Sequence, residues 1–113
     1  WQAKKLSQAR TYAQKAISFN ENYGEPYILL AQMYGSNPNW SDEPALNRCT
    51  YYVVIDKLQR AKAVDPSVTD KVNELIATYA RHTPQAKDLF MLGYKAGDRI
   101  TIGGWIGEST TIR

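Results

Sequence analysis

The sequence predicts a mainly α-helical domain built from antiparallel helix pairs, an α-solenoid fragment, that ends in a short β-hairpin. Apolar residues recur at spacings of three and four through most of the chain, which is the period of an α-helix. Turns that contain proline or glycine divide this pattern into separate segments. After Gly97 the pattern changes to the alternation Ile100-Thr101-Ile102, which is typical of a β-strand.

The first two expected helices run from about Ala3 to Asn20 and from Glu25 to Gly35. Small residues recur at helical spacing on the first, which indicates that another helix packs closely against it. Pro26 fits the first turn of the second helix, where a missing backbone N–H leaves no bond unmade. A polar loop at about 35–44 follows. The apolar positions are Leu6, Ala9, Ala13 and Ala16, then Tyr27, Leu30, Ala31 and Tyr34.

Three further helices are expected. The third spans about 43–64 and ends before a proline. The fourth begins at Ser67, because Ser67 and Asp70 have the spacing of a capping box. The fifth spans about 84–95, with Thr83 as its N-cap and a proline just inside the first turn.

The expected hairpin turns at Gly103-Gly104, since both residues of a tight two-residue turn need positive φ angles. This turn would place Ile102 opposite Trp105 and Ile100 opposite Gly107. The apolar face near the turn must be buried, because an isolated hairpin is marginally stable at best. The fifth helix is the nearest element that is expected to cover it.

Length and charge limit the possible functions. A chain of 113 residues suits one domain, and 43% hydrophobic residues is enough for a packed core. No segment is long and apolar enough to span a membrane. The net charge is +3, and the excess lies in the first expected helix. Nucleic-acid-binding proteins carry a basic stripe, often interleaved with aromatic residues, so this charge pattern argues against nucleic acid as a partner.

The single cysteine, Cys49, rules out an internal disulfide. Cys49 and His82 alone do not supply the ligands of a zinc site. A Cys–His catalytic pair brought together by folding is left open. However, Cys49 begins an apolar helical run and is expected to be a small buried residue, and His82 is expected to close a helix.

No catalytic constellation is present in the pattern. Asp42 and Glu43 are adjacent, so they do not present carboxylates on two sides of a substrate. Asp98 and Glu108 fit the exposed charges of a hairpin. Gly103-Gly104 fits a turn rather than a phosphate-binding loop. The sequence therefore predicts no enzyme activity, no catalytic residues, no cofactor and no bound metal.

Two segments of the chain repeat each other at an offset of 45 residues, the separation of Tyr27 and Val72 (72 − 27). A fixed internal period of this length is typical of stacked helix pairs. The matching positions are Ala9, Ala13, Ala16, Tyr27, Leu30, Ala31 and Tyr34 in the first segment, and Val54, Leu58, Ala61, Val72, Leu75, Ile76 and Tyr79 in the second.

This pattern resembles the tetratricopeptide repeat (TPR), in which an aromatic residue, Leu, a small residue and Tyr mark the first helix of each pair. The period exceeds the usual 34 residues by about eleven, which places an insertion at 35–50. Ile76 departs from the small residue of the signature, and Glu21 stands where a proline is expected. The residues that carry the resemblance are Tyr27, Leu30, Ala31 and Tyr34, then Leu58, Ala61 and Pro66.

The end of the chain is similar to a group of bacterial TPR proteins, often exported, that close with a helix and a β-hairpin. The resemblance implies TPR-like repeats over 1–84 and a capping helix with a hairpin over 85–113. It also points to an exported, periplasmic or cell-envelope location. Because the repeat starts partway at Trp1, the chain is expected to be a piece of a longer protein. The residues concerned are Gly104, Trp105, Ile106, Glu108 and Arg113.

Stacked helix pairs line a concave surface with their first helices, so the resemblance implies a partner bound there. We therefore expect a protein–protein interaction scaffold that holds an extended or helical segment of a partner. Replacing Ile28 and Asn73 together with charged residues is expected to abolish binding without unfolding the domain. The expected contact residues are Glu25, Ile28 and Gln32 on the second helix, Asp70, Asn73, Ala77 and Arg81 on the fourth, and Trp40 in the inserted loop.

The alternative is a purely structural C-terminal cap of a longer repeat array, with no binding activity of its own. A repeat does not bury its apolar face alone, so a stack needs a cap. Trp105 would then be a cap residue rather than a surface anchor for a partner. Removing residues 85–113 should in that case lower solubility and the melting temperature but leave upstream binding intact. The sequence leaves the partner's identity and the oligomeric state open.

Overall fold

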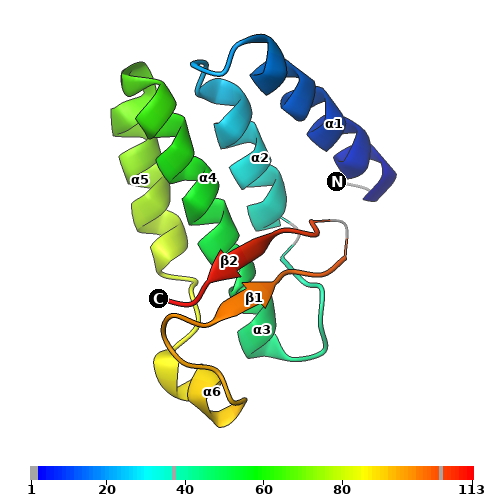
Figure 1. Cartoon of the computed structure of the whole chain (residues 1–113), viewed down its shortest axis with the longest axis vertical. Coiled ribbons are helices and arrows are strands. Elements are labelled where there is room, and N and C mark those ends of the chain that lie inside the picture. The colour runs from blue at the N-terminus through cyan, green and yellow to red at the C-terminus, as the bar shows by residue number, and fades with distance from the viewer. Residues whose placement is uncertain (1–2, 37, 105) are drawn as a thin grey trace.

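The computed structural model describes residues 3–36, 38–104 and 106–113 and confirms a mainly α-helical domain with a C-terminal hairpin (Figure 1). The expectations for Trp105, and the residue Trp1, lie outside the described residues. No helix among the described residues is long and apolar enough to cross a membrane. The elements are α1 (Ala3–Phe19), α2 (Glu25–Ser36), α3 (Pro44–Arg48), α4 (Thr50–Val64), a 3₁₀ helix (Pro66–Val68), α5 (Thr69–Ala80), α6 (Ala86–Met91), β1 (Arg99–Thr101) and β2 (Ser109–Thr111).

Four helices form the body of the domain, with α2 in contact with α1 and α4, and α4 in contact with α5 (Figure 1). The middle of this layer is mostly apolar, because α2 and α4 bury side chains on most of their surfaces. Apolar burial of this kind is the dominant favourable term in folding. The largest fully buried side chains of these helices include Tyr34, Ile28, Met33, Leu58, Val53 and Val54.

Two contacts join α2 to α5. Lys71 Nζ lies 3.1 Å from Glu25 Oε2. At the other end, a Cβ placed on Gly35 would lie 2.7 Å from the ring of Tyr79, so only glycine fits there without a shift. The paired positions are 46 and 44 residues apart (71 − 25 and 79 − 35), close to the 45-residue offset. The two helices therefore run in the same direction, with equivalent positions of the repeat beside each other.

The turn before α2 and the turn after α4 are held together by Asp65. Its carboxylate accepts hydrogen bonds from the backbone N–H of Gly24 (2.9 Å) and of Ser67 (3.1 Å). The hydroxyl of Ser67 also donates to it, and these bonds lower the pKa of Asp65 below its usual value. The expected capping box of Ser67 and Asp70 is therefore wrong, because Asp65 caps the chain where it enters a 3₁₀ turn before α5.

The third expected helix is divided into two. α3 ends at Arg48, and the backbone N–H of Cys49 bonds to the carbonyls of Leu46 and Asn47 before α4 begins at Thr50. Bonds to nearer carbonyls tighten the last turn of a helix and change its direction. Glu43 caps α3 by accepting from the N–H of Ala45 at 3.4 Å.

The fifth expected helix is shorter than the pattern indicates, since α6 ends at Met91 rather than near Lys95. Gly93 has a φ of +90°, and the N–H of Tyr94 reaches back to the carbonyl of Leu89 at 2.9 Å. Together with the bond from Gly93 N–H to Phe90 O, this is a Schellman motif, which terminates a helix. Thr83 is also not the cap, because the N-cap position is Gln85.

The hairpin has a longer loop than expected. Ile100 lies opposite Thr110 and Thr101 opposite Ser109, so the two-residue turn and the pairing of Ile100 with Gly107 are wrong. Of Gly103 and Gly104 only Gly104 has a positive φ, whereas the tight turn needs both. The strands pack on α4 through β2, and Leu89 of α6 belongs to the same buried cluster as Ile100 and Ile112 of the hairpin segment.

Candidate partner-binding site

The three expected contact residues on α2 differ in exposure. Gln32 is exposed, and Glu25 is half-buried and paired with Lys71. Ile28 is only 1% exposed, so the expectation that it lies on a free surface is wrong. A charge at this position would be placed in the core, where an unpaired charge is strongly destabilising. The substitution of Ile28 and Asn73 would therefore unfold the domain rather than isolate a binding face.

The expected residues on α5 are all exposed: Asp70, Asn73, Ala77 and Arg81. Asn73 accepts a hydrogen bond from Lys62 Nζ of α4 at 3.1 Å, so it lies at the edge that faces α4. Lys71, next to Asp70, reaches Glu25 of α2. The α5 set therefore forms an exposed polar surface, of which the Asp70 end, next to Lys71, approaches the start of α2.

Trp40 lies elsewhere, between α3 and the hairpin loop. Its indole Nε1–H donates to the carbonyl of Leu46 at 3.1 Å, and its backbone N–H donates to Asn47 Oδ1 at 3.0 Å. The ring is within 3.1 Å of the place that a Cβ on Gly103 would occupy. Trp40 therefore joins the loop before α3 to the hairpin loop.

A hollow of about 350 Å³ lies between α1 and α2, and we name it the α1–α2 groove. Glu25, Ile28 and Gln32 line it from α2, so three of the expected residues do meet at one place. The sequence interpretation missed the opposite wall, in which Tyr12 is 76% exposed. Tyr12 and Ala16 are four residues apart and therefore share a helix face, which is the signal that would have found them. The remaining lining residues are Ala13, Ala16, Tyr23, Pro26 and Leu29.

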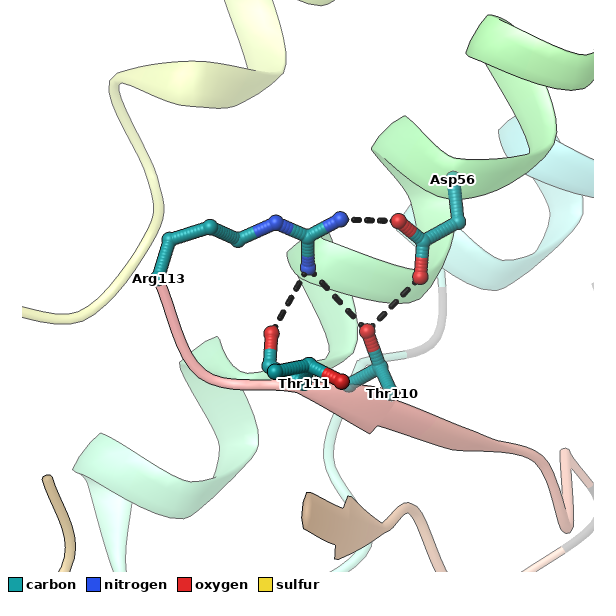
Figure 2. A network of polar contacts seen from close by, with 4 residues as sticks. All are labelled: Asp56, Thr110, Thr111 and Arg113. Carbon is teal, nitrogen blue, oxygen red and sulfur yellow. Dashed lines mark hydrogen bonds and ion pairs between the residues drawn. The ribbon is translucent and has the colours of Figure 1, made fainter. Parts of the chain in front are cut away.

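A polar network fixes the end of the hairpin on α4 (Figure 2). Thr110 Oγ1 donates to Asp56 Oδ2 at 2.7 Å, and the guanidinium of Arg113 pairs with Asp56 Oδ1. Arg113 also donates to Thr110 Oγ1 and to the carbonyl of Thr111, and it lies over the ring of Tyr52 at 5.1 Å. The two bonds to Asp56 join β2 and Arg113 to α4, and the bonds from Arg113 to Thr110 and Thr111 hold this segment in shape, so the network is a structural clamp.

A second polar cluster joins the hairpin loop to the core. Glu108 accepts from the hydroxyl of Tyr34 at 2.5 Å and pairs with Lys57 Nζ at 2.7 Å. Burial, followed by the hydrogen bond to Glu108, raises the pKa of Tyr34 far above its usual value. The tyrosine therefore stays protonated and donates at every physiological pH.

Cys49 and His82 lie in different environments. Cys49 is fully buried, and burial raises its pKa to about 11, so its thiol is protonated at neutral pH. His82 is exposed and its ring lies 5.2 Å from that of Tyr51. Within the described part of the chain, no group of three His, Cys, Asp or Glu side chains has the arrangement of a metal site. In comparisons with protein-family models, curated proteins and solved structures, nothing matches this chain.

Proposed function

We propose that this domain is a protein–protein interaction scaffold built from TPR-like helix pairs. The observation that carries the proposal is the register of α2 with α5, through the contacts Glu25–Lys71 and Gly35–Tyr79. Helices at equivalent repeat positions run parallel, and α4 packs against both. This is the relation between neighbouring repeats in a solenoid, whose stacked helices form an extended binding surface.

The α1–α2 groove is the anchoring point for a partner in this proposal. Its walls are mostly apolar, with the exposed ring of Tyr12 on one side and the side chain of Gln32 on the other. An apolar side chain of a partner segment fills the space over Ala13 and Ala16. Gln32 supplies an amide that both donates and accepts hydrogen bonds with a partner backbone. Aromatic side chains are favoured as anchors in such interfaces.

The polar surface of α5 extends this site in the proposal. Asp70, Asn73, Ala77 and Arg81 give it mixed charge, and the Glu25–Lys71 ion pair lies between it and the groove. Exposed charges add little affinity but influence the choice and the orientation of a partner. The groove is therefore the part whose removal should abolish binding.

Partner capture tests the proposal. The immobilised domain is exposed to a lysate of the source organism, and retained proteins are identified by mass spectrometry. The groove variant carries Tyr12→Glu and Ala16→Glu, and its matched control carries Gln8→Glu and Gln14→Glu, two exposed positions of α1. Wild type and control should retain the same protein, and the groove variant should lose it. Equal retention by both variants, with unchanged circular dichroism, would remove the groove from the proposal.

A structural cap is the second candidate function, and the clamp formed by Asp56, Thr110 and Arg113 favours it. In that function the hairpin covers α4 and the domain closes a longer stack. Removing residues 85–113 should then lower the melting temperature while partner capture by the groove persists. Unchanged thermal stability after the truncation would contradict the capping role.

A further inference from the structure

α6 (Ala86–Met91) lies at the end of the molecule away from the tops of the four body helices (Figure 1), and it carries exposed apolar side chains together with the residue after it. Phe90 is 76% exposed, Met91 84% and Leu92 40%. Single exposed apolar residues are ordinary on protein surfaces, whereas a contiguous set marks an interaction site. We name this surface, together with the hollow beside it, the α6 patch.

The local chain geometry explains why these side chains face solvent. α6 has only six residues, and Leu89 is the one that it buries. Phe90 and Met91 follow at steps of about 100° around the helix, so they point away from the core when Leu89 points into it. The Schellman motif at Gly93 then turns the chain back and places Tyr94 beside Leu89. The patch is thus held in place by a defined helix end.

A hollow of about 410 Å³ lies beside these residues, which is within the size range of ligand pockets. Its apolar walls include Leu89, Phe90, Tyr94 and Ile112. Its charged lining is entirely basic among the described residues, with Lys87, Lys95 and Arg113. Arg113 is held by Asp56, whereas neither lysine forms an ion pair within the described part of the chain.

We propose that the α6 patch binds an acidic peptide segment of a protein partner, in which a bulky apolar side chain is flanked by Asp or Glu. The apolar side chain enters the hollow against Leu89 and Tyr94. The flanking carboxylates lie near the ammonium groups of Lys87 and Lys95. Apolar burial supplies affinity, and the charges select an acidic sequence over a basic one. This site is separate from the α1–α2 groove and does not depend on it.

The charges around the tip favour a peptide over an anionic membrane surface. Asp88 lies on the same short helix as Lys87 and, with Glu43 and Arg48, lines a neighbouring hollow beside Met91, so this side of the tip has mixed charge. A bilayer would cover the whole tip and meet these carboxylates as well as the lysines. A peptide seated in the hollow meets only basic and apolar side chains. The occupant is therefore a discrete segment rather than a lipid surface.

Fluorescence anisotropy tests the proposal with three labelled peptides. In the first a Leu-Phe pair is flanked by glutamates, in the second the glutamates are lysines, and in the third the Leu-Phe pair is Ser-Ser. Only the first should bind. Phe90→Ser, and separately Lys87→Glu with Lys95→Glu, should each weaken it by about tenfold or more, which corresponds to 1.4 kcal/mol.

Matched controls separate the patch from general effects. Phe19→Ser removes another highly exposed phenylalanine, on α1, and Lys15→Glu with Arg60→Glu makes the same charge change at exposed positions of α1 and α4. Neither control should change binding. All replaced side chains are exposed, and circular dichroism checks that each variant is folded.

Several results would overturn the proposal. Equal binding of the lysine peptide or the serine peptide would remove the claimed selectivity, and so would no binding at all. Binding to phosphatidylserine vesicles without binding to the acidic peptide would assign the patch to a membrane. A dimer in sedimentation velocity that Phe90→Ser dissociates would assign it to a second copy of this chain.

Discussion

The hydroxyl of Tyr34, in the middle of the core, donates a 2.5 Å hydrogen bond to Glu108 in the hairpin loop. These residues are 74 positions apart in the sequence, and Lys57 of α4 pairs with the same carboxylate. Three elements, α2, α4 and the hairpin loop, therefore meet at one partly buried polar contact. A hydrogen bond from a neutral donor to a charged acceptor contributes more to stability than a hydrogen bond between two neutral groups.

Tyr34→Phe should lower the free energy of unfolding by about 1–2 kcal/mol, since it removes this bond but leaves Glu108 paired with Lys57. The pKa of Tyr34 is raised in the folded state above the value of about 10 that a tyrosine has in the unfolded chain. The stabilisation that its protonated form provides is therefore complete below about pH 10 and is lost as the pH rises further. Urea unfolding from pH 7 to 11 measures both effects. In Tyr34→Phe the alkaline loss of stability should be smaller, and an equal loss in both proteins would contradict the assignment.

The energetic coupling between Asp56 and Arg113 should be weak, although several bonds link the residues of the clamp. Both side chains are more than a third exposed, so solvent screens their attraction. A double-mutant cycle with Asp56→Ala and Arg113→Ala should give a coupling energy of about 0.5–1 kcal/mol at low salt, and less at high salt. Thr110 is buried, and Thr110→Val should be the more destabilising change because it removes the hydroxyl that donates to Asp56 Oδ2 and accepts from Arg113. A coupling energy that does not change with salt would contradict this account.

Cys49 should react slowly in the native protein. Burial raises its pKa to about 11, and its thiol contacts the carbonyl of Ala45 at 3.6 Å. At pH 8 roughly one thiol in a thousand is ionised, and only the thiolate attacks disulfide reagents. Modification by Ellman's reagent should therefore be slow in buffer and fast in urea. Fast native modification would show that the α3–α4 junction opens without global unfolding.

Local patterns predicted most of the helices, because the residues that start, end and bury a helix lie close together in the sequence. Pro26 and the apolar spacing of Tyr27, Leu30 and Tyr34 were enough to place α2. The cap before α5 was misassigned, since both Asp65 and Ser67 are good capping residues. The choice between them depends on Gly24, 41 residues earlier in the chain, which donates to Asp65.

Tertiary contacts explain the errors in the site. Helical spacing placed Ile28 on one face with Glu25 and Gln32, but its burial depends on where α1 packs. The hairpin loop was misjudged because Gly103-Gly104 is compatible with a tight turn, while contacts with Trp40 and α4 select a longer one. The α6 patch was missed because Leu89, Phe90 and Leu92 fit an ordinary apolar helix face, whereas α6 buries only Leu89 and ends before Leu92.

The positive φ of Gly93 allows α6 to end at Met91. This φ of +90° is a conformation that costs an L-amino acid about 1–2 kcal/mol, whereas a Cβ at this position meets no neighbouring atom within 4 Å. Gly93→Ala should therefore lower stability through backbone strain alone. Gly93→Asn is the matched control, since asparagine adopts positive φ more readily than alanine. The Gly93→Asn variant should therefore lose less stability than Gly93→Ala.

The same change tests whether the sequence pattern competes with the observed helix end. If the Schellman motif is broken in Gly93→Ala, α6 is expected to extend toward Lys95, because Ala favours a helix interior over Gly by about 1 kcal/mol. Tyr94 would then leave its place beside Leu89, and the α6 patch would lose one wall. Amide hydrogen exchange would show new protection at Lys95, whose N–H donates to the side chain of Asp98 in the native turn, together with weaker binding of the acidic peptide. New protection without weaker binding would separate the peptide site from the helix end.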